Sequence, residues 1–253
     1  MLTALTRRLL YHPQREMVAT PQQAGLGYRQ LTLTAEDGVR VVAWYVPAER
    51  ADAPAILYCH GNAGNISTRL PTLLLCHQLG FGVLAFDYRG YGFSEGTPSE
   101  EGTARDARAA WDALTGPLGI GPGRVVLVGR SLGGAIAARL ANERPAAGVS
   151  LECAFTSVPD VAAELFWFLP ARWIVRAQYP TVAHVRRFDC PVMVAHSPDD
   201  RLIRYHHGEE LYAAAQESKR FVRLRGSHAG AVHESGEVYR QALADFVNAC
   251  TGR

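Results

Sequence analysis

One short segment combines serine and glycine in a spacing that can make the serine a nucleophile. Gly129-Arg130-Ser131-Leu132-Gly133 has the form G-x-S-x-G and lies between the apolar run Val125–Val128 and an alanine-rich stretch. A strand, a sharp turn and a helix in this order expose the serine oxygen at a helix N-terminus, where free N–H groups favour negative charge. Glycines two positions before and after the serine leave out Cβ atoms that would clash in such a turn. Ser131 is therefore the predicted nucleophile.

A serine attacks efficiently only when a base takes its proton and an acid orients that base. We predict His228 as the base, because it is the histidine closest to the end of the expected strand 221–224. His233 follows five residues later and is more typical of a polar loop or a helix start. His206 and His207 lie where another helix is expected to begin, and we expect both to be solvated there.

The acid is predicted in the loop that follows the apolar run Val192–Ala195 and contains Asp199 and Asp200. Adjacent aspartates cannot both face one histidine. We favour Asp200, because the apolar pair Leu202-Ile203 behind it can anchor the loop, and we interpret Asp199 as a turn or capping residue. Serine, acid and histidine then occur in the order Ser, Asp, His. Both later loops leave the carboxyl ends of strands, where open α/β sheets place their ligands.

Acyl transfer from a serine also needs N–H donors for the oxyanion that forms in the reaction. The backbone N–H of Leu132, directly after the nucleophile, is the first predicted donor. The second is predicted in the loop 59–65, whose small residues allow close approach of the backbone. We favour the N–H of Asn62, with Ala63 as the alternative.

The elements that must position these residues alternate along the chain. Strands are expected at 30–35, 39–46, 55–59, 82–86, 125–128, 149–151, 192–195 and 220–225, and helices at 67–79, 99–115, 132–142, 205–217 and 236–250. This alternation predicts an α/β fold with a mostly parallel sheet of about eight strands and helices on both faces. Residues 1–28 form a lead-in and residues 29–253 one domain, with a short lid insertion at about 155–188 above the carboxyl edge of the sheet.

The lid insertion is rich in aromatic and basic residues. Residues 165–188 contain six aromatic residues and four arginines but no acid. From this segment we predict Phe166, Trp167 and Trp173 to bind the substrate. The alternatives are that the aromatic residues are ordinary core that covers the sheet edge, or that they form a basic surface that rests on a membrane.

Over roughly residues 30–250 the sequence resembles the α/β-hydrolase superfamily. The resemblance rests on His60-Gly61-Asn62, on the run Asp87–Gly92 followed by Ser94, on the G-x-S-x-G segment and on the ordered Asp and His loops. Within the superfamily, the chain is similar to the serine esterase and thioesterase branch that includes membrane-associated protein depalmitoylases, and to serine aminopeptidase-like hydrolases. The resemblance implies an α/β-hydrolase fold, no dissociable cofactor, and a catalytic triad of Ser131, Asp200 and His228. It also implies that Asp87 and Arg89 hold the loop beneath the site.

Composition narrows the remaining function classes. With 48% hydrophobic residues, 20% charged residues and a net charge of +2, the chain is typical of globular proteins and has no overall basic field for nucleic acid. The five cysteines form no C-x-x-C pair and are expected as reduced thiols, and no spacing of histidines and carboxylates predicts a metal site. Because Arg7 and Arg8 interrupt the apolar N-terminus, no signal peptide is predicted. We therefore expect a cytoplasmic protein whose lid is available for peripheral membrane contact.

These features predict a serine hydrolase that cleaves a carboxylic ester or thioester through an acyl-enzyme. The expected substrate is a small-molecule or lipid-like acyl compound. A serine peptidase, a C–C hydrolase and a cofactor-free haloperoxidase are the alternatives on the same three side chains. A non-catalytic binding module is disfavoured, because the triad residues are all present. The oligomeric state is not indicated by the sequence.

Overall fold

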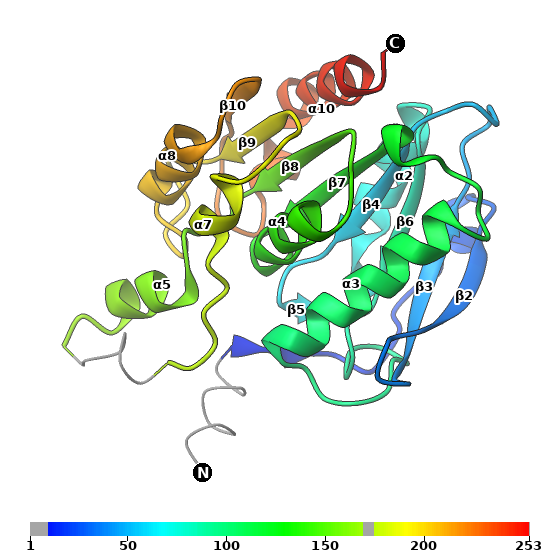
Figure 1. Cartoon of the computed structure of the whole chain (residues 1–253), viewed down its shortest axis with the longest axis horizontal. Coiled ribbons are helices and arrows are strands. Elements are labelled where there is room, and N and C mark those ends of the chain that lie inside the picture. Colours follow the sequence, from blue (N-terminus) through cyan, green and yellow to red (C-terminus); the bar gives the residue numbers. More distant parts are fainter. Residues whose placement is uncertain (1–9, 169–174, 253) are drawn as a thin grey trace.

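The computed structural model describes residues 10–168 and 175–252 (Figure 1). Eight strands form one sheet in the order β10-β9-β8-β7-β4-β6-β3-β2. Their bounds are β2 Arg29–Thr34, β3 Arg40–Val46, β4 Ala55–Cys59, β6 Gly82–Phe86, β7 Val125–Arg130, β8 Gly148–Glu152, β9 Val192–His196 and β10 Lys219–Arg223. β3 is antiparallel to both β2 and β6, and every other neighbouring pair in this sheet is parallel. The predicted fold class is confirmed.

Helices cover both faces of the sheet, which is why its central strands are apolar throughout. Along β7, Val125 and Leu127 pack into one hydrophobic cluster, whereas Val126 and Val128 pack into the other. The first cluster includes residues of α3 Glu100–Thr115, α4 Leu132–Glu143, α7 Thr181–Val185 and α8 Tyr205–Ala214. The second includes residues of α2 Leu70–Gln78, α9 Ala231–Glu234 and α10 Gly236–Thr251. This two-layer core holds the carboxyl ends of the parallel strands at one edge.

The first part of the lid insertion is a helix of two turns, α5 Val158–Leu165, which Figure 1 shows standing off from the sheet. Ser157 caps this helix, because its hydroxyl accepts a hydrogen bond from the Asp160 N–H at 3.2 Å. The chain returns to the core at Tyr179, whose N–H donates to Glu100 at the start of α3 over 2.7 Å. Within the described residues, no helix has both the length and the apolar character needed to cross a bilayer.

A short N-terminal strand, β1 His12–Pro13, pairs with β5 Ala63–Gly64 apart from the main sheet. The His12 N–H donates to the Asn62 carbonyl at 3.1 Å, and the Gln14 N–H donates to the Gly64 carbonyl at 3.1 Å. This pairing has no periodicity that sequence analysis would detect, because each strand has only two residues. Part of the predicted lead-in is thus built into the loop after β4.

A buried ion-pair network holds the loop after β6. Arg89 is 6% exposed, and its guanidinium donates to both Asp106 of α3 and Asp37 of the β2–β3 turn, with closest distances of 2.8 and 2.7 Å. The Arg89 N–H also donates to Asp106 at 2.8 Å. One side chain thereby connects the hairpin, the loop and the helix. These contacts agree with the structural role that the family resemblance implies for Arg89.

Replacing Asp106 with alanine should destabilise the protein strongly. The change leaves a buried guanidinium without its best partner, a loss that typically costs about 3–5 kcal/mol. We expect the free energy of unfolding, measured in urea, to fall by about 3 kcal/mol, the lower end of this range, because Asp37 still pairs with Arg89. Arg50→Ala is the control, since its ion pair with Asp52 is exposed and should contribute nothing measurable. Equal stability of both variants would refute this account of the network.

Candidate active site

Ser131 lies at the turn between β7 and α4 in a backbone conformation that serine rarely adopts. Its φ is 52° and its ψ is −118°, and its N–H donates to the Glu152 carbonyl of the neighbouring strand at 2.8 Å. The turn is possible only because the residues two positions before and after Ser131 are glycines, which have no side chain. A Cβ on Gly129 would overlap the Gly133 carbonyl, and a Cβ on Gly133 would overlap the carbonyl oxygen of Cys59. The strain therefore lies at the predicted nucleophile.

The imidazole of His228 connects the serine to a carboxylate. Its Nε2 lies 3.0 Å from the Ser131 hydroxyl, and its Nδ1 lies 2.6 Å from Asp200 Oδ2. The three side chains come from three loops, after β7, β9 and β10, that all leave the carboxyl edge of the sheet. This geometry allows Nε2 to accept the serine proton while the Nδ1–H is held by the carboxylate.

Asp200, rather than its neighbour Asp199, contacts the histidine. Its second oxygen accepts hydrogen bonds from the N–H groups of Leu202 and Ile203, at 3.0 and 2.9 Å. Of the apolar pair expected to anchor this loop, Ile203 is buried in the core but Leu202 is 47% exposed, so the expectation is wrong for Leu202. Both residues hold Asp200 through their backbone N–H groups. Asp199 instead accepts from the Gly226 N–H at 3.2 Å, which ties the acid loop to the histidine loop.

The Asp200 carboxylate is buried but stays ionised. Burial raises its pKa, but the hydrogen bond and charge of His228 together with the Ile203 N–H outweigh this, so its pKa lies below the usual value. The ionised form therefore contributes to stability at pH values above about 3.9, the unfolded value. That contribution is lost as the pH falls through the lower pKa of the folded state.

The loop after β4, which carries the predicted oxyanion donor Asn62, packs against Ser131. A Cβ on Gly61 would lie 3.7 Å from the Ser131 Cβ. Two buried tyrosines from the loop after β6 hold the loop after β4 in place. Tyr88 donates to the His60 carbonyl and Tyr91 to the Asn62 carbonyl, both at 2.7 Å. The Asn62 side chain donates to the Leu10 carbonyl at 2.7 Å. The loop is thus fixed on two sides before any ligand binds.

Leu132, the other predicted oxyanion donor, is the first residue of α4. N–H groups in the first turn of a helix have no partner four residues earlier, so they are free to meet a developing negative charge. Leu132 follows Ser131 directly, and Asn62 lies in the loop that packs against Ser131. Ala63, the alternative donor, belongs to the short strand β5, which pairs with β1.

Arg130 is a site residue that the sequence analysis did not identify. It occupies the first variable position of G-x-S-x-G, and its guanidinium Nη2 donates to the carbonyl of His228 at 2.9 Å and to that of Ala229. The histidine loop is therefore anchored on the residue next to the nucleophile. Only the fold brings these positions, 98 residues apart in sequence, into contact.

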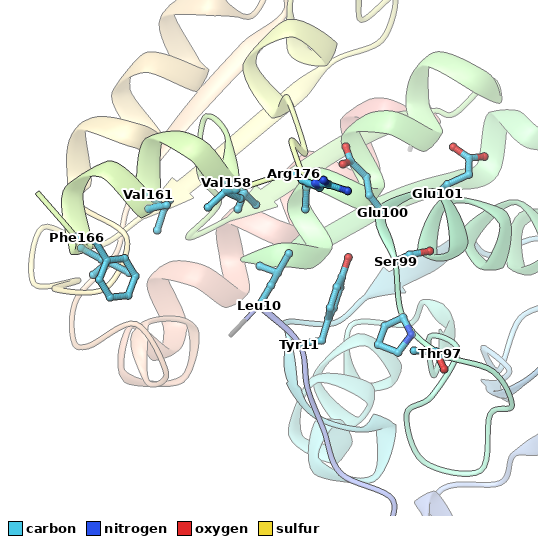
Figure 2. Close-up of a pocket in the computed structure, with 15 residues that line it drawn as sticks. Leu10, Tyr11, Thr97, Ser99, Glu100, Glu101, Val158, Val161, Phe166 and Arg176 are labelled. Carbon is cyan, nitrogen blue, oxygen red and sulfur yellow. The ribbon is translucent and has the colours of Figure 1, made fainter. Parts of the chain in front are cut away.

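An apolar cavity of about 630 Å³ lies between the lid helix and the N-terminal segment (Figure 2). Val158, Val161 and Phe166 line one wall, and Leu10 and Tyr11 line the opposite wall. None of Ser131, Asp200 and His228 lines the cavity, but the Leu10 carbonyl on its wall accepts the hydrogen bond from Asn62, in the loop beside Ser131.

The lid residues predicted to bind substrate have different positions. Phe166 lines the cavity, whereas Trp167 is 83% exposed and is not among the lining residues. Trp173 lies outside the described residues. Tyr179 and Phe188 are buried in the core, as the alternative interpretation of the aromatic residues expected for part of the segment.

The remaining histidines divide between solvent and core. His233 is exposed on α9 and makes none of the contacts that His228 makes with Ser131 and Asp200. His206 is partly exposed, with 43% of its side-chain surface accessible. The expectation for His207 was wrong: it is 1% exposed, because the first turn of α8 packs its ring against the chain at Thr156. A helix start indicates solvation only when no other segment covers it.

Removing the Arg130 guanidinium should slow the reaction of Ser131 with an active-site-directed fluorophosphonate. Arg130→Met keeps most of the buried side-chain volume but loses both bonds to the histidine loop. We expect the labelling rate to fall about tenfold, the equivalent of about 1.4 kcal/mol, with partial recovery in Arg130→Lys. Arg220→Met, which removes an exposed ion pair with Asp245, is the matched control. An unchanged rate in Arg130→Met would show that the histidine loop does not need this anchor.

Known proteins are similar to this chain in sequence and in fold. The model of the alpha/beta hydrolase family matches residues 56–180. The alpha/beta hydrolase domain-containing protein WAV2 of Arabidopsis thaliana is 33% identical, with 98% of this chain and 89% of the relative covered. The lysophosphatidylserine lipase ABHD12 of Rattus norvegicus is 31% identical over 70% of this chain and 49% of its own length.

A solved structure, the esterase of Pyrococcus furiosus, superposes with a TM-score of 0.78 at 17% identity and covers 96% of this chain and 98% of its own. At this identity the likeness concerns the fold, which has the same arrangement of sheet and helices. Sequence relatives and fold agree with the resemblance seen in the motifs. The protein belongs to the α/β-hydrolase family.

Proposed function

We propose that this hydrolase-family protein cleaves carboxylic esters or thioesters with Ser131 as its nucleophile. The observation that carries the proposal is the continuous chain of contacts from the Ser131 hydroxyl through both nitrogens of His228 to Asp200, at 3.0 and 2.6 Å. An unassisted serine is a weak nucleophile, and this arrangement supplies both the base and the group that orients it.

In the first half of the reaction, the Ser131 oxygen attacks the acyl carbonyl and His228 Nε2 takes its proton. The negative charge that develops on the carbonyl oxygen is stabilised by the N–H groups of Leu132 and Asn62. Nε2 then donates the proton to the leaving alkoxide or thiolate, and the acyl group stays on Ser131. In the second half, water attacks the acyl-enzyme, again with His228 as base, which releases the carboxylic acid and restores the serine.

The apolar cavity beside the lid supports a substrate with an apolar acyl or alcohol chain. Its walls are formed mainly by aliphatic and aromatic side chains, and ligand pockets of this character bury apolar groups while a few polar groups set orientation. At about 630 Å³ it has the volume of a typical small-molecule pocket. We assign the chain of the substrate to this cavity and its reacting carbonyl to Ser131.

The outer tip of the lid supports a substrate presented in a lipid-like phase. Leu165, Phe166, Trp167 and Phe168 are consecutive, and their exposed fractions are 45, 39, 83 and 65%. Exposed apolar runs of this kind are expected where a protein contacts lipid or a partner. A relative named as a lysophosphatidylserine lipase is consistent with this direction, although the covered part is only 49% of that protein.

Substitutions in two matched pairs test the catalytic assignment. Ser131→Ala, His228→Ala and Asp200→Asn should each lower hydrolysis of a p-nitrophenyl ester by at least about 10³-fold, because the three groups act as a unit. The neighbours His233→Ala and Asp199→Asn should stay within about threefold of the native rate, on the same scale. Should Asp199→Asn be the inactive member of its pair, the acid would be misassigned. A native protein that neither hydrolyses esters nor labels with a fluorophosphonate contradicts the whole proposal.

Filling the cavity should change the preference for chain length. Val161→Trp adds a large ring on the cavity wall of α5, so hydrolysis of a long-chain p-nitrophenyl ester should fall about tenfold relative to the acetate ester, about 1.4 kcal/mol. Val238→Trp, at a position 57% exposed on α10, is the control and should leave the ratio unchanged. A constant ratio in Val161→Trp would place the chain elsewhere.

A further inference from the structure

A second cluster of titratable side chains lies between the lid helix α5 and the first turn of α8. Glu164, near the end of α5, places its Oε1 2.9 Å from His206 Nε2 and 3.4 Å from His207 Nε2. All three atoms lie within 4.8 Å of one another. Two ligand atoms about 2.0–2.1 Å from one zinc ion are at most about 4.2 Å apart, and both distances from Glu164 Oε1 are shorter than that.

His207 is the unusual member of the cluster. The side chain is 1% exposed, yet its Nε2 makes no hydrogen bond among the described residues, and its contact with Glu164 at 3.4 Å is a long ion pair. Buried polar atoms are normally satisfied, so an unpaired nitrogen calls for a partner. A cavity of about 230 Å³ opens at this place and is lined by Thr156, Asp160, Ala163, Glu164, His206, His207 and Glu210.

The other nitrogen of His207 is already oriented. Its Nδ1 lies 2.9 Å from the Thr156 hydroxyl, which in turn donates to Asp160 at 2.9 Å. In the tautomer with a proton on Nδ1, His207 donates to this hydroxyl and its bare Nε2 faces Glu164. Metal-binding histidines commonly use their second nitrogen in this way, because the hydrogen bond fixes both tautomer and ring orientation. The backbone N–H of Thr156, 3.3 Å from Nδ1, favours the opposite tautomer through a longer contact.

We propose that Glu164, His206 and His207 bind a divalent transition-metal ion, best matched by zinc, that fastens the lid helix α5 to α8. Two imidazoles and a carboxylate are a donor set that zinc accepts. Glu210, one turn along α8 with its Oε1 3.9 Å from His206 Nε2, is placed to provide the fourth ligand after a small rotation. The ion would join two segments about forty residues apart in sequence, a separation that explains why no motif reveals the site.

A second group of possible metal ligands lies at the active site, where Cys153 is close to Asp200 and His228. That group is less suited to a metal. Asp200 is already hydrogen-bonded to His228 and to the backbone N–H groups of Leu202 and Ile203. Burial raises the pKa of the Cys153 thiol to about 12, which disfavours the thiolate that binds metals. The Glu164 cluster has no such internal pairing at His207 Nε2.

Cobalt provides a direct test, because tetrahedral Co²⁺ with nitrogen ligands absorbs visible light. The full chain, freed of metal with a chelator, is titrated with Co²⁺ and then with Zn²⁺ in competition. We expect one equivalent of Co²⁺ to produce the absorption and Zn²⁺ to abolish it. The affinity should fall at least tenfold in Glu164→Gln and in His206→Asn, but not in His233→Asn, a control at an exposed histidine, or in His228→Asn.

The thermal midpoint gives a second measurement that does not depend on colour. A ligand that binds only the folded state raises the Tm, so Zn²⁺ should raise it by several degrees in the native protein and not in Glu164→Gln. Because Glu164 and His206 are not fully buried, both variants should fold, which circular dichroism in the absence of metal verifies. Absence of stoichiometric binding, binding that survives both substitutions, or binding lost only in His228→Asn would each overturn the proposal.

Discussion

The packing of the β7–α4 turn against the end of β4 is the constraint on which the rest of the site depends. Gly133 lies so close to the backbone of Cys59 and His60 that no side chain fits there. That proximity keeps Ser131 in its strained conformation and, by the same contact, places the loop carrying Asn62 beside it. The positions of Ser131 and of the Asn62 loop are therefore set by one backbone contact, between the first turn of α4 and the end of β4. Strain of this kind persists only where the surrounding structure over-determines it.

Around this contact, hydrogen bonds between side chains and backbone groups hold the loops of the site. Asp200 receives two N–H groups, Asp199 holds Gly226, and Arg130 reaches across to the carbonyl of His228. Each loop is thus tied to another loop of the site. Substitutions that remove such a tie, as Arg130→Met does, are expected to slow the reaction of Ser131, because small displacements of positioned groups cost large factors in rate, whereas Asp199→Asn keeps an oxygen that can accept from Gly226.

Local sequence patterns predicted the strands of the main sheet, most helices, the sharp turn at Ser131 and the order of the Asp and His loops. Ser131 was predictable because the glycines it requires are its sequence neighbours. Asp200 was predicted through side chains, whereas the structure shows backbone N–H groups as the cause. The contacts of Arg130, the two-residue strand β1 and the burial of His207 all arise between segments far apart in sequence. No periodicity or spacing encodes such contacts, since they depend on which surfaces the finished sheet brings together.

The pairing of β1 with β5 has a consequence for how this chain can be rearranged. Residues 12–14 extend the loop after β4, and the preceding Leu10 contributes both to the cavity wall and to the position of Asn62. Although β1 is not part of the main sheet, it is part of the site. A circular permutant with new termini just before β2 would keep all eight sheet strands. The N-terminal segment would then follow α10 at the end of the chain instead of preceding β2. Chain connectivity at this point is thus linked to the position of Asn62, and a domain boundary drawn at the first sheet strand would divide the candidate site.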